Sequence, residues 1–237
     1  MTEYKAIETI YNGYRFRSRL EARWAVFFDT AGIRYEYEPE GFEIEYSDWD
    51  QPIRYLPDFY FPDWDIYGEV KPSLEKLKED EEKLAWMIDY GGPMSNGLLV
   101  LGQIPNPNRN GIPALYLLIN RNKSIARVPC TILNEEPLWT EGKPTACLLR
   151  ADYDADNASA PELPLSGLLW GHTAASHPLF ESTVCIPKRM EVPGLRRPLY
   201  MRITFAQVGE MIPFDAYTKA RQARFEYGET PKVTEGI

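Results

Sequence analysis

The sequence predicts an α/β fold in which a central mixed sheet is flanked by helices. Helical segments are expected at residues 18–31 and 73–89, and the stretch between them holds several short segments with strand-like alternation of apolar and polar residues. A continuous apolar segment at 98–101 follows the second helix, as expected for a buried strand. A helix, several strands, a helix and a strand, in this order, predict helices packed on a sheet.

The first helix is expected to end at Gly32 and to carry one apolar stripe. The stripe consists of Leu20, Trp24, Phe27, Phe28 and Ala31. Glu21 lies at the edge of this stripe, and a carboxylate turned towards a core needs a polar partner. Ser18 and Glu21 also have the spacing of a capping box, in which the glutamate reaches back to the N-cap amide. The sequence leaves both roles open for Glu21.

Short strands are expected around these helices. Aromatic and β-branched residues dominate the segments at 53–61 and 66–71, and the Pro-Asp-Trp-Asp sequence at 62–65 is typical of a turn between them. The other segments expected to be extended are 11–16, 33–39, 42–46, 98–101, 114–120, 130–134, 145–150 and 199–205, and a last helix is expected at 213–228.

The turn at 62–65 has a chemical consequence. A hairpin closed at the middle of this turn places Asp58 directly opposite Glu69, with Cβ atoms about 5 Å apart. Because side chains alternate along a strand, Glu69 and Lys71 share a face. Two opposed carboxylates repel unless a cation lies between them, and oxygen ligands completed by water suit Mg²⁺ or Mn²⁺. The sequence therefore predicts a metal site at Asp58 and Glu69, with Glu21 as a third candidate.

Two segments carry a resemblance to a known family. FRSRLEARWAVFFDTAGIRYEYEP and YLPDFYFPDWDIYGEVKP resemble the PD-(D/E)xK nuclease superfamily, and the order of their parts resembles the branch that holds phage junction-resolving and transposon-end endonucleases. The similarity covers residues 14–103, which is under half of the chain. It implies a restriction-endonuclease-like core, and a DNA endonuclease encoded by a phage or a mobile element.

The resemblance also implies a role for each residue of the motif. Asp58 and Glu69 would be metal ligands, and the main-chain carbonyl of Val70 would join the metal shell. Lys71 would be the catalytic lysine. Glu21 would be an additional ligand or an acid that orients the attacking water. The number of metal ions, and the form of the DNA substrate, are left open.

A second function class stays open beside the enzyme. A nuclease-like fold can serve as a non-catalytic binding or structural partner in a larger assembly. The net charge of −9 argues against bulk electrostatic binding of nucleic acid, and the large C-terminal region carries no motif. The intact set of acids and lysine favours the enzyme.

Basic residues nevertheless gather beside the predicted site. Arg15, Arg17 and Arg19 precede or begin the first helix, with Arg23 one turn further on, and the first three are candidates for contacts to DNA phosphates. The alternative is that these arginines form ion pairs within the chain, for which the nearby acids are Glu36, Glu38, Glu40, Glu43 and Glu45. Further basic residues lie on the last predicted helix, at Lys219, Arg221 and Arg224.

Length and composition set the remaining expectations. Residues 1–125 are expected to form the nuclease-like core, and residues 126–237 a C-terminal α+β extension without an assigned role. The three cysteines show no CxxC spacing, and no apolar signal segment or run of 18 apolar residues occurs, so a cytoplasmic protein that does not contact the membrane is expected. The expected partner is DNA, and the sequence leaves open a homodimer or membership of a larger complex.

Overall fold

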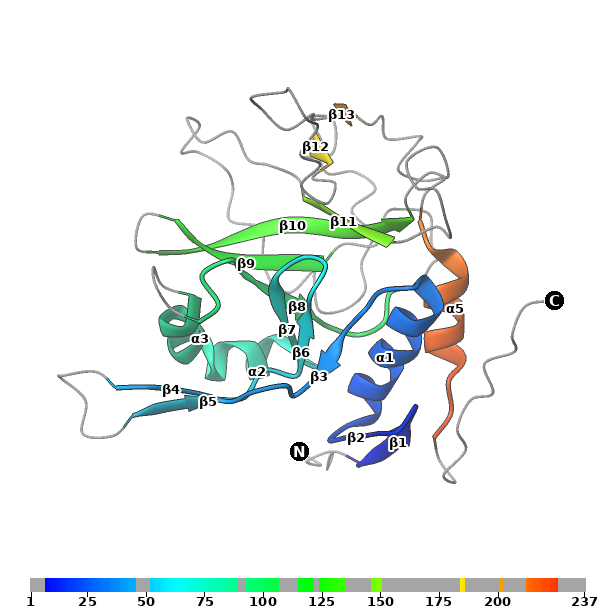
Figure 1. Cartoon of the computed structure of the whole chain (residues 1–237), viewed down its shortest axis with the longest axis horizontal. Helices are drawn as coiled ribbons and strands as arrows, with labels where there is room; N and C mark the ends of the chain where they lie inside the picture. Colours follow the sequence, from blue (N-terminus) through cyan, green and yellow to red (C-terminus); the bar gives the residue numbers. More distant parts are fainter. Residues whose placement is uncertain are drawn as a thin grey trace.

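The computed structural model describes residues 7–45, 52–88, 93–106, 115–121, 124–134, 146–150, 184–185, 201–202 and 212–225. Within these residues the chain is mixed α/β, and its largest element is a nine-stranded sheet (Figure 1). The strands of this sheet, in spatial order, are β13 (Met201–Arg202), β12 (Val184–Cys185), β11 (Ala146–Arg150), β10 (Ser124–Asn134), β9 (Leu115–Arg121), β8 (Leu98–Leu101), β7 (Ile66–Val70), β6 (Phe59–Phe61) and β3 (Glu36–Tyr37). The β7–β8 pair is parallel and the other neighbouring pairs are antiparallel, so the sheet is mixed, as expected.

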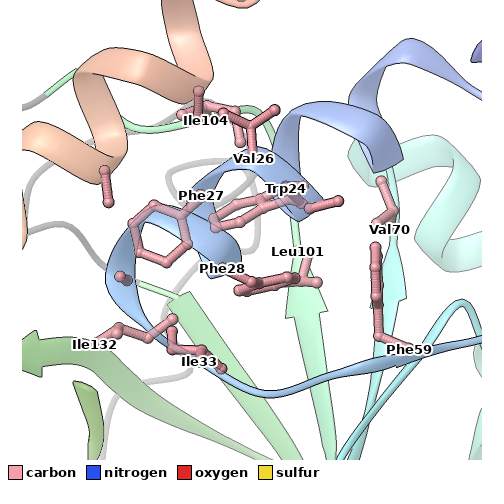
Figure 2. Close-up of a cluster of buried hydrophobic side chains, with 14 of the residues drawn as sticks. Trp24, Val26, Phe27, Phe28, Ile33, Phe59, Val70, Leu101, Ile104 and Ile132 are labelled. Carbon is pink, nitrogen blue, oxygen red and sulfur yellow. The ribbon is translucent and has the colours of Figure 1, made fainter. Parts of the chain in front are cut away.

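One face of the sheet is covered by α1 (Arg19–Ala31) and α5 (Phe214–Gln222), which lie side by side (Figure 1). The bounds predicted for α1 are confirmed: Ser18 caps its first turn, and Gly32 ends it in a left-handed conformation with a φ of 71°. Phe27 packs on Tyr217 of α5, with ring centroids 4.4 Å apart. Figure 2 shows the aromatic side chains of α1 above the strands, where they form the main core.

The other face is covered by α2 (Leu74–Glu79) and α3 (Glu81–Ile88), together with the two-stranded sheet of β4 (Phe42–Ile44) and β5 (Ile53–Tyr55). This small sheet projects from the body as an arm beside the two helices (Figure 1). Alternate residues of β8 serve the two faces: Leu99 and Leu101 join the core under α1, and Leu98 and Val100 join the core under α3. Helices on both faces therefore fix the ends of β7 and β8.

Three predicted elements are corrected by the structure. The segment at 53–61 is two strands in different sheets, β5 and β6; Pro57 lies between them and has no backbone N–H to donate to a sheet ladder. The helix predicted at 73–89 is two helices, which meet at Asp80. The strand predicted at 33–39 is reduced to β3.

The segment predicted as one strand or arm at 11–16 is a hairpin. β1 (Thr9–Tyr11) and β2 (Tyr14–Phe16) pair antiparallel across Asn12 and Gly13. Both turn residues have positive φ values, 46° and 84°, as a two-residue hairpin turn requires. The Asn-Gly pair is a sequence signal typical of such a turn, although one extended segment was expected here. The hairpin ends just before α1.

The C-terminal region contributes to the same architecture. β10 crosses residue 125 and pairs with β9 along its first seven residues, so the sheet continues through the predicted domain boundary. β11 confirms the strand predicted at 145–150, whereas β13 and α5 cover only parts of the segments predicted at 199–205 and 213–228. The division at residue 125 stays a prediction. In the part of the chain that the structure describes, no helix is long and apolar enough to cross a membrane.

Candidate functional site

The β6–β7 hairpin brings two buried carboxylates to the same place. Its register pairs Phe59 with Gly68, as expected from the turn. Asp58 directly precedes Phe59 and Glu69 directly follows Gly68, so the two carboxylates lie beside the end of this pairing, where the charge of Glu69 acts on Asp58. Asp58 is 4% exposed and Glu69 is 6% exposed. The backbone amide of Val70 donates a hydrogen bond to Asp58 Oδ2 at 2.7 Å, which fixes the carboxylate against the end of β7.

The second oxygen of Asp58 is held by an arginine. Arg17 Nη2 donates to Asp58 Oδ1 at 2.9 Å, and the same guanidinium also pairs with Glu38. Burial raises the pKa of Asp58 well above its ordinary value, and the charges of Glu69 and Glu21 raise it further. The Val70 amide and Arg17 act in the opposite direction and do not cancel this effect. The protonated form of Asp58 is therefore favoured, first by burial and then by the two neighbouring acids.

Glu69 shares a lysine with a residue from the helical layer. Lys71 Nζ lies 2.8 Å from Glu69 Oε1 and also pairs with Asp80, where α2 meets α3. Burial alone would lower the pKa of Lys71, but the charges of Glu69 and Asp80 outweigh it and raise the pKa. Lys71 is therefore kept cationic. The other oxygen of Glu69, Oε2, is buried and makes no hydrogen bond of normal geometry with the described residues, although the buried Tyr55 hydroxyl interacts with this carboxylate.

Glu21 is turned inward and is fully used by hydrogen bonds. Its Oε2 accepts from the Arg17 amide at 3.0 Å and from the Tyr37 hydroxyl at 2.7 Å, and its Oε1 accepts from the Ser18 hydroxyl at 2.6 Å. The Glu21 amide donates to Ser18 Oγ, so the N-cap interaction occurs. The Glu21 carboxylate accepts from the amide of Arg17, the residue before the N-cap, and not from the amide of Ser18. Its charge still reaches Asp58, as the raised pKa of Asp58 indicates.

Glu69 and Lys71 open into a cavity of about 760 Å³. One side of this cavity is formed by the β4–β5 arm and the other by the α2–α3 segment; its lining includes Arg17, Phe42, Arg54, Tyr55, Asp80 and Lys83. The Tyr55 hydroxyl is buried, and burial followed by the charge of Glu69 raises the pKa of this phenol. The Lys83 ammonium lies 5.0 Å from the centre of the Tyr55 ring.

Asp58 and Glu69 suit a divalent cation better than Glu21 does. Glu69 Oε2 makes no hydrogen bond of normal geometry with the described residues. The pKa of Asp58 is raised first by burial and then by the charges of Glu69 and Glu21, and a cation would relieve the part due to these charges. Mg²⁺ is commonly held by one or two carboxylates with water completing its shell. Glu21, by contrast, would have to give up hydrogen bonds to act as a ligand. Among the described residues, no group of three Asp, Glu, His or Cys side chains is placed to hold a metal ion.

The other predicted residues are distributed as follows. The observed contact of Val70 is made by its amide, and the role of its carbonyl stays a prediction. Arg15 is exposed and pairs with Glu8, which the sequence did not suggest as a partner. Arg19 is half-buried in the first turn of α1. Among the basic residues of the C-terminal helix, Arg221 donates to the Ile104 carbonyl at 3.0 Å.

Sequence reasoning missed Asp80 and Tyr55. Asp80 belongs to an acidic run that the sequence presents as a solvated face, and only the break between α2 and α3 turns it to Lys71. Tyr55 was placed in the same strand as Asp58, where its alternation gave no sign of the cavity. No protein-family model, curated protein or solved structure matches the chain.

Proposed function

We propose that this protein is a metal-dependent DNA endonuclease that hydrolyses phosphodiester bonds at Asp58, Glu69 and Lys71. The observation that carries the proposal is the pair of neighbouring, buried carboxylates with a cationic lysine beside one of them. The order of the motif in the sequence, which resembles the PD-(D/E)xK superfamily, supports the same function and favours a restriction-endonuclease-like core around this sheet. The cavity supplies a path for a phosphate to reach Glu69 and Lys71.

Asp58 and Glu69 are the residues that would hold Mg²⁺ or Mn²⁺. When bound there, such a cation polarises the phosphate and lowers the pKa of its bound water. Asp58 presents one oxygen that is fixed by the Val70 amide and one that is paired with Arg17. Glu69 presents one oxygen to Lys71 and one that makes no hydrogen bond of normal geometry with the described residues. One oxygen of Asp58 is therefore oriented by the backbone, and one oxygen of Glu69 is oriented by Lys71.

Lys71 would act on the phosphate. Its ammonium is held between Glu69 and Asp80, which come from different layers, so the charge has a fixed position at the edge of the cavity. Such a preorganised charge stabilises negative charge that develops on a phosphate during hydrolysis. The same contacts keep the lysine protonated, so it serves as an electrostatic group and not as a general base.

Arg17 and Glu21 would support the site from the other side. Glu21 orders the backbone of Arg17 through the 3.0 Å hydrogen bond, and Arg17 then places its guanidinium on Asp58. This guanidinium balances part of the charge of Asp58. It must move from Oδ1 before that oxygen can bind a cation, and it is then available for a phosphate.

A non-catalytic binding protein is the second candidate. It is favoured by the pairing of Asp58 with Arg17 and by the saturation of Glu21, because both stabilise these acids without a cation. The enzyme is favoured by Glu69, whose buried Oε2 makes no hydrogen bond of normal geometry with the described residues. A binding protein has no need for a buried carboxylate oxygen that lacks a hydrogen bond.

The experiment that separates the two candidates is incubation with supercoiled plasmid, linear duplex, single-stranded and branched DNA, in Mg²⁺, in Mn²⁺ and in EDTA. We expect cleavage of at least one of these DNAs with either cation, no cleavage in EDTA, and none by Glu69→Gln. The matched control is Glu43→Gln, which changes an exposed acid of the same cavity that pairs with Arg54. Cleavage that persists in EDTA, or is equal in Glu69→Gln and the wild type, would remove this mechanism.

A further inference from the structure

The cavity beside Glu69 and Lys71 limits what can reach these two groups. The side chain of Glu69 is 8% exposed and that of Lys71 is 11% exposed. A phosphate therefore has to enter the cavity, because it cannot contact these groups from the outer surface.

The size of the cavity favours a single strand of DNA over a duplex. At about 760 Å³, it lies in the range of pockets that enclose a ligand of drug size. That range corresponds to roughly one or two nucleotides, and two paired strands around a common axis need far more room. A single strand can bend its backbone into such a space, since its bases are not held by a partner strand.

The lining has the chemistry of a site for a single strand. Leu56 is 38% exposed and Phe42 is half-buried on the wall made by the β4–β5 arm, so a base has apolar surface to contact. On the opposite side, Lys83 of α3 lines the cavity over the ring of Tyr55. Lys83 forms no ion pair with the residues that the structure describes, whereas Arg54 pairs with Glu43. Among the residues that the structure describes, Lys83 is therefore a cation of the cavity whose charge no acid pairs with.

We infer that this cavity binds an unpaired DNA strand. Lys83 contacts one phosphate of that strand, and the neighbouring phosphates lie towards Lys71. The choice of DNA rests on the proposed function, whereas the single-strand preference and the role of Lys83 rest on the cavity. The substrate form is then DNA with an unpaired segment, such as a flap, a splayed end or a bubble. The net acidity of the chain is compatible with this because the contact is confined to the cavity.

The test is fluorescence anisotropy with a labelled single-stranded oligonucleotide and a labelled hairpin duplex with the same number of phosphates, in EDTA and over a range of salt. The wild type should bind the single strand several-fold more tightly than the duplex. Lys83→Met keeps the aliphatic stem over Tyr55 and removes the charge. It should weaken binding of the single strand several-fold and reduce the slope of log K against log salt by about 0.7.

Lys78→Met is the matched control, because Lys78 is an exposed cation of α2 that does not line the cavity. It should leave the affinity and the slope unchanged, and melting temperatures should show that both variants are folded. The inference is overturned if the duplex binds as tightly as the single strand, if the wild type binds neither, or if the two lysine variants behave alike. Cleavage of the same oligonucleotides in Mg²⁺ is scored separately: binding through Lys83 without cleavage would reject the proposed function and keep the binding site.

Discussion

Asp58 and Glu69 are buried acids that differ in their contacts with the rest of the protein. Asp58 accepts hydrogen bonds from the Val70 amide and from Arg17, and its pKa is nevertheless raised by burial and by Glu69. Glu69 has a lysine on one oxygen only. A site of this kind costs stability in the absence of a cation, and such a cost is typical of functional sites, where local rules are broken for chemistry.

Asp58→Asn should change how stability depends on pH. The pKa of Asp58 is raised in the folded state, so the folded protein binds this proton more readily, and the free energy of unfolding falls as the pH rises from about 4 through the folded pKa. The decline amounts to about 1.4 kcal/mol for each unit by which the pKa is raised. The asparagine keeps an acceptor for the Val70 amide and does not titrate.

Urea denaturation in EDTA, from about pH 4 to about pH 8, measures this effect. The stability of Asp58→Asn relative to the wild type should improve as the pH rises from about 4 and should level off above the folded pKa of Asp58. A difference between the two proteins that is the same at every pH would mean that Asp58 does not carry a raised pKa.

Arg17→Met should increase the affinity for Mn²⁺. The guanidinium occupies Asp58 Oδ1 and repels a second cation, so its removal frees this oxygen and lowers the local positive charge. Isothermal titration calorimetry should show several-fold tighter binding than in the wild type. Arg15→Met is the control, because Arg15 pairs with Glu8 away from the site. Equal affinities for all three proteins would exclude competition between Arg17 and the metal.

At the scale of elements, the β6–β7 hairpin and the junction of α2 with α3 build the site. The hairpin sets Asp58 against Glu69, and the junction brings Asp80 to Lys71. The sequence predicted the hairpin register because the turn at 62–65 is composed of residues typical of turns. It did not predict the junction, because the apolar positions of 73–89 agree with one continuous helix.

Gly68→Ala should destabilise the hairpin. A Cβ atom at this position would lie 2.7 Å from Phe61 Cε2, and the Phe61 ring is fully buried, so it has little room to move. Overpacking of this kind costs about 1–3 kcal/mol. Gly41→Ala is the control, because its nearest neighbours would be 3.8 Å and 3.9 Å away. Thermal unfolding of both variants tests the prediction, and an equal small change in the two would contradict it.

Asp80→Asn should slow cleavage without weakening DNA binding. The carboxylate holds Lys71 from the helical layer, and asparagine can still accept a hydrogen bond but supplies no charge. The rate of a single turnover should fall, while the dissociation constant for DNA stays the same or improves, since an acid of the cavity is removed. Asp80→Glu should recover part of the rate. A loss of binding in step with the rate would place Asp80 in DNA recognition.

At the scale of the whole molecule, the sequence predicted the mixed sheet with helices on both faces, the bounds of α1, and the segment that holds the site. These features depend on local periodicity, caps and turns, which are visible in a single chain. The contacts that define the cavity were not predictable. They join the β4–β5 arm to α3 through tertiary packing, and no local pattern encodes the position of Lys83 over Tyr55.

The packing of α5 on α1 shows the same limit. A last helix was expected at 213–228, but the partner of α5 is nearly two hundred residues away in the sequence. Such long-range pairings are decided by the whole fold, and composition alone does not disclose them.

The central claim is that Asp58 and Glu69 bind a divalent cation that the protein uses to cut DNA. The most direct test is the single-turnover cleavage rate of labelled DNA with excess protein, measured against Mg²⁺ concentration for the wild type, Glu69→Gln and Glu43→Gln. We predict a cleavage rate that saturates with Mg²⁺ in the wild type and in Glu43→Gln. In Glu69→Gln the rate should fall at least about a hundredfold. A rate independent of Mg²⁺, or a Glu69→Gln variant as fast as Glu43→Gln, would contradict it.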